Sequence, residues 1–292
     1  MSLDQSYLTH IEERLALISP SLVDTLHEAL KALPETVPEE RTRAWLEEGA
    51  GLAEQSPRSW EACGEYFKAG PRALPLLSDD GFEQWTTAGR ALTELAAPMA
   101  ATYYHATPEV VPLLGSAQVR DWAHIGRRLY RATWKSITLA SEYYRLSPQL
   151  LAGFSVAELS RLGRVLEGVS DRSADLAAAC LDAAPKLVME LDHPLRLAFI
   201  DFAGAISDAS WPEASLYFQR GPDLIRGIDA SQRARYLELA TGVARRLPRT
   251  DHRAGVATGA ALARGGDVDG ALRAHAQLPS ASARDRGLAR RR

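Results

Sequence analysis

The chain has 292 residues, and 46% of them are hydrophobic, which is enough for a continuous core. Its net charge of −3 argues against a surface devoted to nucleic acids or anionic membranes, although a local basic patch is compatible with it. No long apolar run, no signal-peptide pattern and only two cysteines are present, so we expect a cytoplasmic protein with no membrane span and no disulfide framework.

Residues 1–40 contain two segments with helical periodicity, roughly Tyr7–Leu17 and Ser21–Leu33. Both fit poorly to the pattern that begins at residue 41. Terminal units of repeat arrays often diverge because one face meets water. Residues 1–40 therefore predict a divergent N-terminal helical cap.

Residues 41–247 repeat a unit of 37–40 residues. Each unit opens with a large apolar anchor, followed by Gly or Ala four residues later and an aliphatic residue seven later. The anchors are Trp45, Trp85, Trp122, Leu159, Phe199 and Tyr236. A fixed period of this length is typical of stacked helical units, and no strand pattern competes with it. We predict an all-α fold, an α-solenoid of about five to six repeats similar to HEAT or TPR arrays.

The first helix of each unit carries the anchor. In four of the six units the residue four positions after the anchor is glycine, and we refer to these residues as the dent glycines: Gly49, Gly89, Gly126 and Gly163. Glycine within a helix costs about 1 kcal/mol relative to alanine, so its recurrence predicts a close helix crossing. Capping residues precede these helices at Ser78 or Asp79, Ser116, Ser155, Asp192, and Asp229 or Ser231.

The second helix is expected to begin near a serine twelve residues before a proline in four of the units, whereas Ala96 takes this position in the unit of Pro108. These serines are Ser59, Ser136, Ser173 and Ser210. The prolines are Pro71, Pro108, Pro148, Pro185 and Pro222. Since proline disfavours helical geometry in the residue before it, we expect the helix to end there and a short third helix to start at the proline.

Residues 248–292 form a degenerate repeat and an arginine-rich tail, which we expect to be disordered. The tail could bind an acidic ligand, but a solvated tail is the simpler interpretation.

Tyrosines precede the prolines at one register, where they would lie at the helix flank. They are Tyr66, Tyr103, Tyr143 and Tyr217. A row of flank tyrosines would suit peptide binding, because tyrosine offers a large contact area and a polar tip. The alternative is that they pack between units with their hydroxyls in water.

Arginines follow the dent glycines: Arg90, Arg127, Arg128 and Arg164. Stacked units would align them into a basic ridge that could hold an acidic partner or phosphate groups. The alternative is a solvated face paired with nearby acids.

Other polar residues do not form a recognisable site. His105 and His124, near Asp121, lack the further ligands that zinc requires. Cys63 and Cys180 are expected to be small core residues. Phosphate-loop, nucleophile-elbow and zinc-protease motifs are missing, so we expect no catalytic residue, no cofactor and no metal, and we predict that the protein is not an enzyme.

The unit W-x₃-G…A-x₃-Y-Y/F-x₃-P-x₂-L resembles the helical repeats that precede the von Willebrand A domain in bacterial proteins of the nitric-oxide-reductase-activation and carbon-monoxide-dehydrogenase-accessory type. The resemblance covers roughly residues 41–247 and is best over 122–154. It implies a MoxR-type AAA+ ATPase or a von Willebrand A domain protein as partner, in the maturation of a metalloenzyme. No von Willebrand domain follows in this sequence, so its metal-dependent binding is not implied.

We expect a non-catalytic protein-interaction scaffold or accessory factor. The alternative is a HEAT-like array that binds nucleic acid through the arginine ridge, which the net charge disfavours. A third possibility, an all-α enzyme, would need acidic or histidine clusters at core positions, where the pattern places apolar residues.

Overall fold

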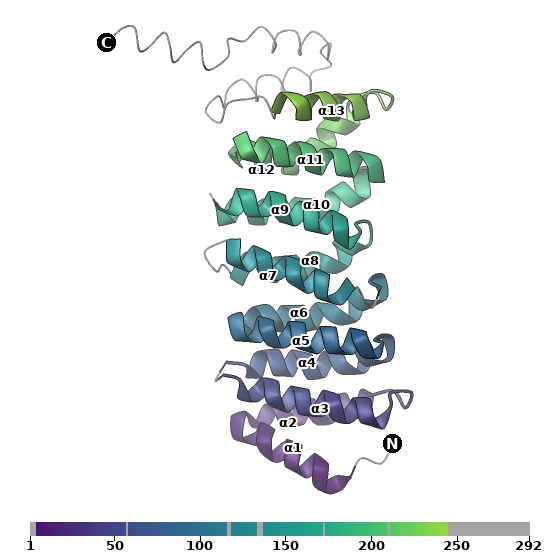
Figure 1. Ribbon diagram of the computed structural model, residues 1–292, viewed down its shortest axis with the longest axis vertical. Coiled ribbons are helices and arrows are strands. Elements are labelled where there is room, and N and C mark those ends of the chain that lie inside the picture. The colour runs from purple at the N-terminus through teal and green to yellow at the C-terminus, as the bar shows by residue number, and fades with distance from the viewer. Residues whose placement is uncertain are drawn as a thin grey trace, which may run out of the picture. The chain divides into compact units, whose positions relative to one another are not determined.

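The computed structural model describes residues 4–56, 58–115, 118–132, 137–171, 173–209 and 211–244. Every secondary-structure element in these ranges is helical, which confirms the all-α class (Figure 1). The chain divides into two compact units, one up to Val156 and one from Ala157. None of the described helices combines the length and the apolar character that crossing a membrane requires.

The first unit contains α1 (Gln5–Ile18), α2 (Pro20–Ala32), α3 (Glu39–Glu54), α4 (Trp60–Ala73), α5 (Asp79–Leu95), α6 (Ala97–Val110), α7 (Val119–Ala132) and α8 (Ile137–Leu151), with short 3-10 helices η1 (Leu74–Leu76) and η2 (Val111–Leu113). The second contains α9 (Val156–Ser170), α10 (Ala174–Glu190), α11 (His193–Ala209), α12 (Trp211–Arg226) and α13 (Arg233–Ala244).

Helices of the first unit form two layers (Figure 1). Odd-numbered helices α1, α3, α5 and α7 each contact the next odd-numbered one, and even-numbered helices α2, α4, α6 and α8 do the same. Each odd-numbered helix also packs on the even-numbered helix that follows it. The two helices predicted within residues 1–40 are therefore present, and they continue this alternation.

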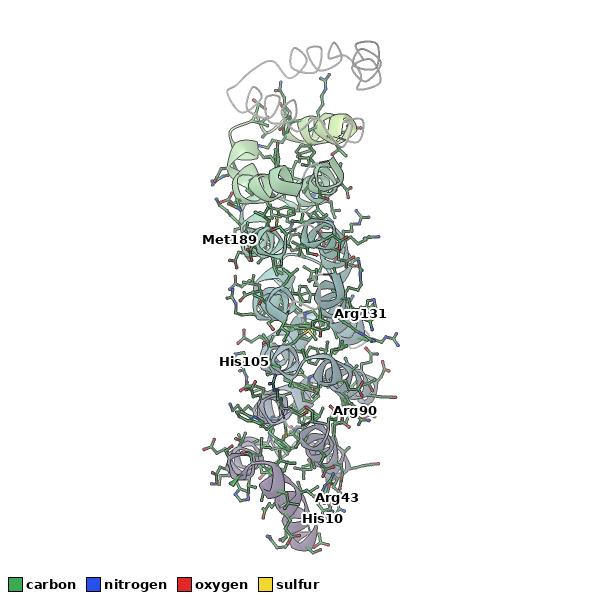
Figure 2. The ribbon with its side chains drawn as sticks, turned by 90° about the vertical axis from the view of Figure 1, so that its left-hand side faces the viewer. His10, Arg43, Arg90, His105, Arg131 and Met189 are labelled. Atoms are coloured by element: carbon green, nitrogen blue, oxygen red, sulfur yellow. The ribbon has the colours of Figure 1, made fainter. Side chains whose placement is uncertain are left out.

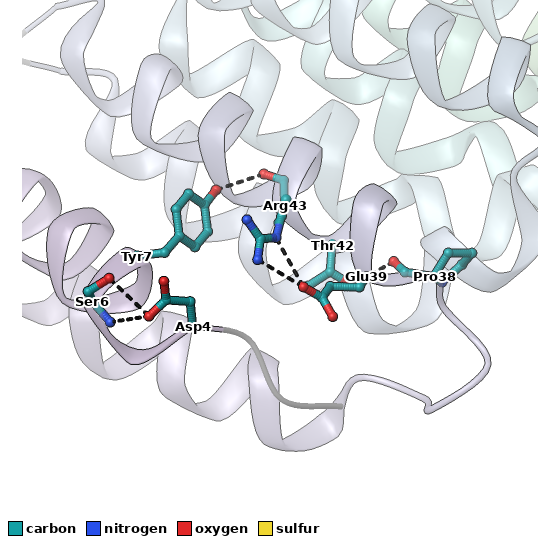
Figure 3. A network of polar contacts seen from close by, with 7 residues as sticks. All are labelled: Asp4, Ser6, Tyr7, Pro38, Glu39, Thr42 and Arg43. Carbon is teal, nitrogen blue, oxygen red and sulfur yellow. Dashed lines mark hydrogen bonds and ion pairs between the residues drawn. The ribbon is translucent and has the colours of Figure 1, made fainter.

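The N-terminal helix is joined to α3 by a small polar network (Figure 3). Asp4 caps α1 by accepting from the backbone N–H of Ser6 at 2.9 Å. The Tyr7 hydroxyl donates to the carbonyl of Arg43 at 3.1 Å, and the Arg43 guanidinium lies over the Tyr7 ring. Arg43 also pairs with Glu39, so one side chain supports both helices.

In the second unit, α10 packs on α12, and α11 packs on both α12 and α13. The rings of Phe199 and Phe218 meet edge to face, with centroids 5.6 Å apart. Both side chains are fully buried, as expected for the anchor and core positions that they occupy.

The predicted helix caps are confirmed in part. Ser78, Ser173 and Asp192 each accept a hydrogen bond from a backbone N–H three residues later. Ser59 precedes α4, but its hydroxyl bonds to Ser56 and does not cap the helix. Asp229 bonds to the N–H of Ser231 in a turn before α13. Ser116, Ser136 and Ser210 lie outside the described residues.

The expectation that the second helix ends before the proline is wrong. All five prolines, from Pro71 to Pro222, lie inside α4, α6, α8, α10 and α12. The missing N–H removes one hydrogen bond, but continuing the helix buries apolar residues that follow the proline, such as Ala73 in α4 and Val110 in α6. The two short 3-10 helices come after these helices and do not start at the proline.

The predicted close crossing is confirmed in the first unit. A Cβ atom placed on Gly126 would lie 2.3 Å from Cζ of Tyr144, so only glycine lets α7 approach α8 this closely. The aromatic side chains then stack through the unit. Tyr66 stacks on Trp85, and Tyr103 stacks on Trp122, with centroids 4.8 Å apart in each pair.

Candidate functional site

The flank tyrosines of the first unit lie inside it. Tyr66, Tyr103 and Tyr143 are at most 1% exposed. Their hydroxyls donate to the backbone carbonyls of the anchor tryptophans Trp45, Trp85 and Trp122, at 3.1, 3.2 and 3.4 Å respectively. Burial raises the pKa of all three phenols. The expectation that these hydroxyls reach water or a peptide is therefore wrong.

The burial of these tyrosines has a clear physical cause. The dent glycines bring each even-numbered helix so close to its odd-numbered neighbour that the helix flank becomes part of the interior. Tyr66, for example, donates its hydroxyl to the carbonyl of Trp45, the anchor of its own repeat, and stacks its ring on Trp85, the anchor of the next repeat. A large side chain at this position therefore fills the space between the anchors of two successive repeats.

Tyr217 is only partly buried, and it belongs to the second unit. Its ring contacts Phe199 and Phe202, and its hydroxyl bonds to the hydroxyl of Tyr236. Desolvation raises the pKa of Tyr217. Like the other three, this tyrosine is engaged in packing between helices.

The residues before Pro108 and Pro148 have a role that the sequence pattern did not indicate. Each accepts a hydrogen bond from the anchor tryptophan of the same repeat. The indole N–H of Trp85 donates to the Thr107 hydroxyl at 3.0 Å, and that of Trp122 donates to the Ser147 hydroxyl at 2.8 Å. A hydroxyl residue recurring opposite a tryptophan was the signal that could have revealed it.

The cysteines and histidines do not form a site together. Cys63 and Cys180 are fully buried, as predicted. His105 bonds to Glu65 of α4 in the even-numbered layer, whereas His124 is exposed on α7 in the odd-numbered layer. Within the described ranges, no three His, Cys, Asp or Glu side chains lie close enough to hold a metal ion.

Arg90 is not free to join a basic ridge. It pairs with Glu48 of α3, and its Nε lies 3.1 Å from Glu48 Oε1. The hydrogen bond that Arg90 donates to the Glu48 carboxylate raises the pKa of Arg90. Arg164 is exposed on α9 in the second unit. Arg90 is therefore paired with a nearby acid, as the alternative interpretation expects, and the alignment of Arg164 with the arginines of the first unit stays a prediction.

Arg127 and Arg128 lie on α7, where the structure reveals a different basic feature. Both are half-buried. Positively charged or histidine side chains follow one line along this helix, at Arg120, His124, Arg127 and Arg131, and we refer to these four residues as the α7 basic stripe. Figure 2 shows Arg131 on the same side of the first unit as Arg90 and Arg43, with His105 on the opposite side.

The neighbouring helices of this layer carry the opposite charge. α5 has four acidic residues and one arginine, and α3 has five acidic residues and two arginines, whereas α7 has four arginines and one aspartate. This contrast between whole helices is not visible when equivalent positions of the repeats are compared. Comparisons with protein families, curated proteins and solved structures found no match for the chain.

Proposed function

We propose that the chain is an α-solenoid that acts as a non-catalytic protein-interaction scaffold or accessory factor. The same positions for large, small and aliphatic residues recur every 37–40 residues along residues 41–247. The two-layer packing of the first unit is the arrangement that such repeats favour.

The interior of the first unit supports this proposal most directly. The hydroxyls of Tyr66, Tyr103 and Tyr143 bond to backbone carbonyls of neighbouring helices, so these polar groups hold the helices together. Substrate chemistry would need polar groups that face a ligand. Within the described residues of the first unit, the charged side chains are instead at least partly exposed, where a macromolecular partner would meet them.

The partner that we propose first is a MoxR-type AAA+ ATPase or a von Willebrand A domain protein, with a role in maturing a metalloenzyme. The support is the resemblance of the repeat unit, whose structural slots at Trp85, Gly89 and Tyr104 are filled as the pattern requires.

The test is direct binding of the purified full chain to the purified MoxR-type ATPases of its host, with and without ATP, over a series of salt concentrations. Saturable binding at moderate salt supports the proposal. No binding to any of these ATPases or to the host's von Willebrand A proteins would contradict this choice of partner.

Nucleic-acid binding is the second candidate, and the α7 basic stripe is the observation that favours it. Binding of duplex DNA or RNA that falls steeply with salt concentration would place it first. The acidic surplus on α3 and α5 opposes a polyanion that extends along this layer.

A further inference from the structure

We propose that the α7 basic stripe binds a single acidic helical segment of a partner protein. The proposal deepens the scaffold function and rests on it, because it names the surface used and the chemistry of the ligand.

The stripe has the geometry of one helix face. Arg120, His124, Arg127 and Arg131 are spaced by four, three and four residues, which places them on one side of α7. They span about 16 Å along the helix axis. The opposite side of α7 is buried through Trp122, so this helix cannot rotate to hide its charges.

The positive charge of the stripe is not neutralised within the described residues. Arg120 and Arg131 are exposed and form no ion pair in that part of the chain. The Nε of Arg127 is buried and has no hydrogen-bond partner there. By contrast, Arg90 on the adjacent helix already has Glu48. The exposed guanidinium groups of Arg120 and Arg131 thus remain available for carboxylates.

The adjacent helix limits the width of the ligand. α5 carries Asp79, Asp80, Glu83 and Glu94, and neighbouring helix axes lie about 8–10 Å apart. This distance is comparable to the screening length at physiological salt, so the positive potential of the stripe is about one helix wide on this side. A nucleic-acid duplex or a membrane surface would extend over α5 and meet its carboxylates. A single helix, about 10 Å across, would not.

The complementary ligand follows from the spacing. A helix with Asp or Glu at positions i, i+4, i+7 and i+11 presents its carboxylates with the same repeat as the stripe. Arginine can bind each carboxylate through two parallel N–H donors, which adds geometric selection to the charge attraction. The segment needs about three turns of helix.

The experiment uses the full chain and a fluorescently labelled alanine-based peptide of about 18 residues with glutamate at this spacing. A second peptide has the same composition with its glutamates scrambled, and a short DNA duplex is the third probe. The test variant is Arg120→Glu with Arg131→Glu. The control is Arg72→Glu with Arg145→Glu, which changes net charge equally on exposed positions of the even-numbered layer. Thermal melts verify that both variants stay folded.

We expect the spaced peptide to bind more tightly than the scrambled one, and the stripe variant to weaken its binding by about tenfold while the control changes it little. No binding of the spaced peptide, equal loss in both variants, or tighter binding of the DNA duplex to the same residues at equal salt would overturn the proposal. A host partner that binds the wild type and the stripe variant equally well would overturn it while leaving the scaffold function standing.

Discussion

The ring of Phe67 occupies the space that a side chain on Gly49 would need. A Cβ atom placed on Gly49 would lie 2.4 Å from Cζ of Phe67, well inside van der Waals contact. The relationship recurs one sequence period later, where a Cβ atom on Gly89 would lie 1.9 Å from the hydroxyl oxygen of Tyr104. The glycines thus set how closely the two layers of the first unit approach.

Replacing Gly49 with alanine should destabilise the protein by about 1–3 kcal/mol, because the buried Phe67 ring must move. Gly51 on the same helix provides the control, since no atom lies within 4 Å of its Cβ position. Gly51→Ala should stabilise by about 0.5–1 kcal/mol through helix propensity. Urea unfolding of both variants measures the difference, and equal effects would contradict the close approach.

Tyr104 and Tyr144 occupy equivalent positions on α6 and α8, but removing their hydroxyls should affect stability differently. The Tyr144 hydroxyl donates to the carbonyl of Ala123 at 2.8 Å, whereas the buried Tyr104 hydroxyl has no hydrogen-bond partner in the described part of the chain. We expect Tyr144→Phe to cost about 1 kcal/mol and Tyr104→Phe to be neutral or stabilising. Unfolding midpoints report this, and a larger loss for Tyr104→Phe would show that its hydroxyl is bonded in solution.

Ser147 should matter for stability through the indole of Trp122. Ser147→Ala removes the acceptor of the buried indole N–H and should cost about 1–3 kcal/mol. Ser141→Ala on the same helix, at a partly exposed position, is the control and should not destabilise. The indole N–H resonance of Trp122 should shift in the first variant alone. If unfolding of the two variants is indistinguishable, the hydrogen bond contributes nothing measurable.

Glu65 should make the fold sensitive to acid. Burial raises the pKa of this carboxyl, but hydrogen bonds from Lys68 and His105 outweigh burial, so its pKa in the folded state is below the usual 4.5. A lowered carboxyl pKa stabilises the fold above about pH 4.5, and this contribution is lost as the pH falls through the folded value.

Glu65→Gln should therefore flatten the decrease in unfolding midpoint between about pH 5 and pH 3. Glu109→Gln on α6 changes an exposed carboxyl and should leave the wild-type slope unchanged. A Glu65→Gln profile parallel to the wild type would rule out this contribution.

Much of the local structure could be predicted because it depends on neighbours along the chain. The anchors Trp45, Trp85 and Trp122 are all buried on helices, as their spacing indicates. Ser78 and Ser173 cap helices because the N–H groups that they accept lie three residues away. The glycines indicated close packing because glycine within a helix is costly without a steric reason.

The candidate site could not be predicted in the same way. The sequence pattern of α4 alone places Tyr66 at the helix flank, but Trp85 and Trp45 of other helices enclose it. The spacing of the arginines predicts that Arg90 joins a basic ridge, because no local pattern shows that Glu48, 42 residues earlier, lies beside it.

Periodicity and local hydrogen bonding are enough to predict the helical class, the approximate positions of the helices and the spacing of large and small residues along them. Three properties become visible only in the packed fold: helices continue through Pro71 and its equivalents, the tyrosines of the first unit lie inside it, and α7 keeps a basic face. The reason is that these properties depend on burial and charge pairing between helices that are distant in the chain, and such pairing is absent from any local pattern.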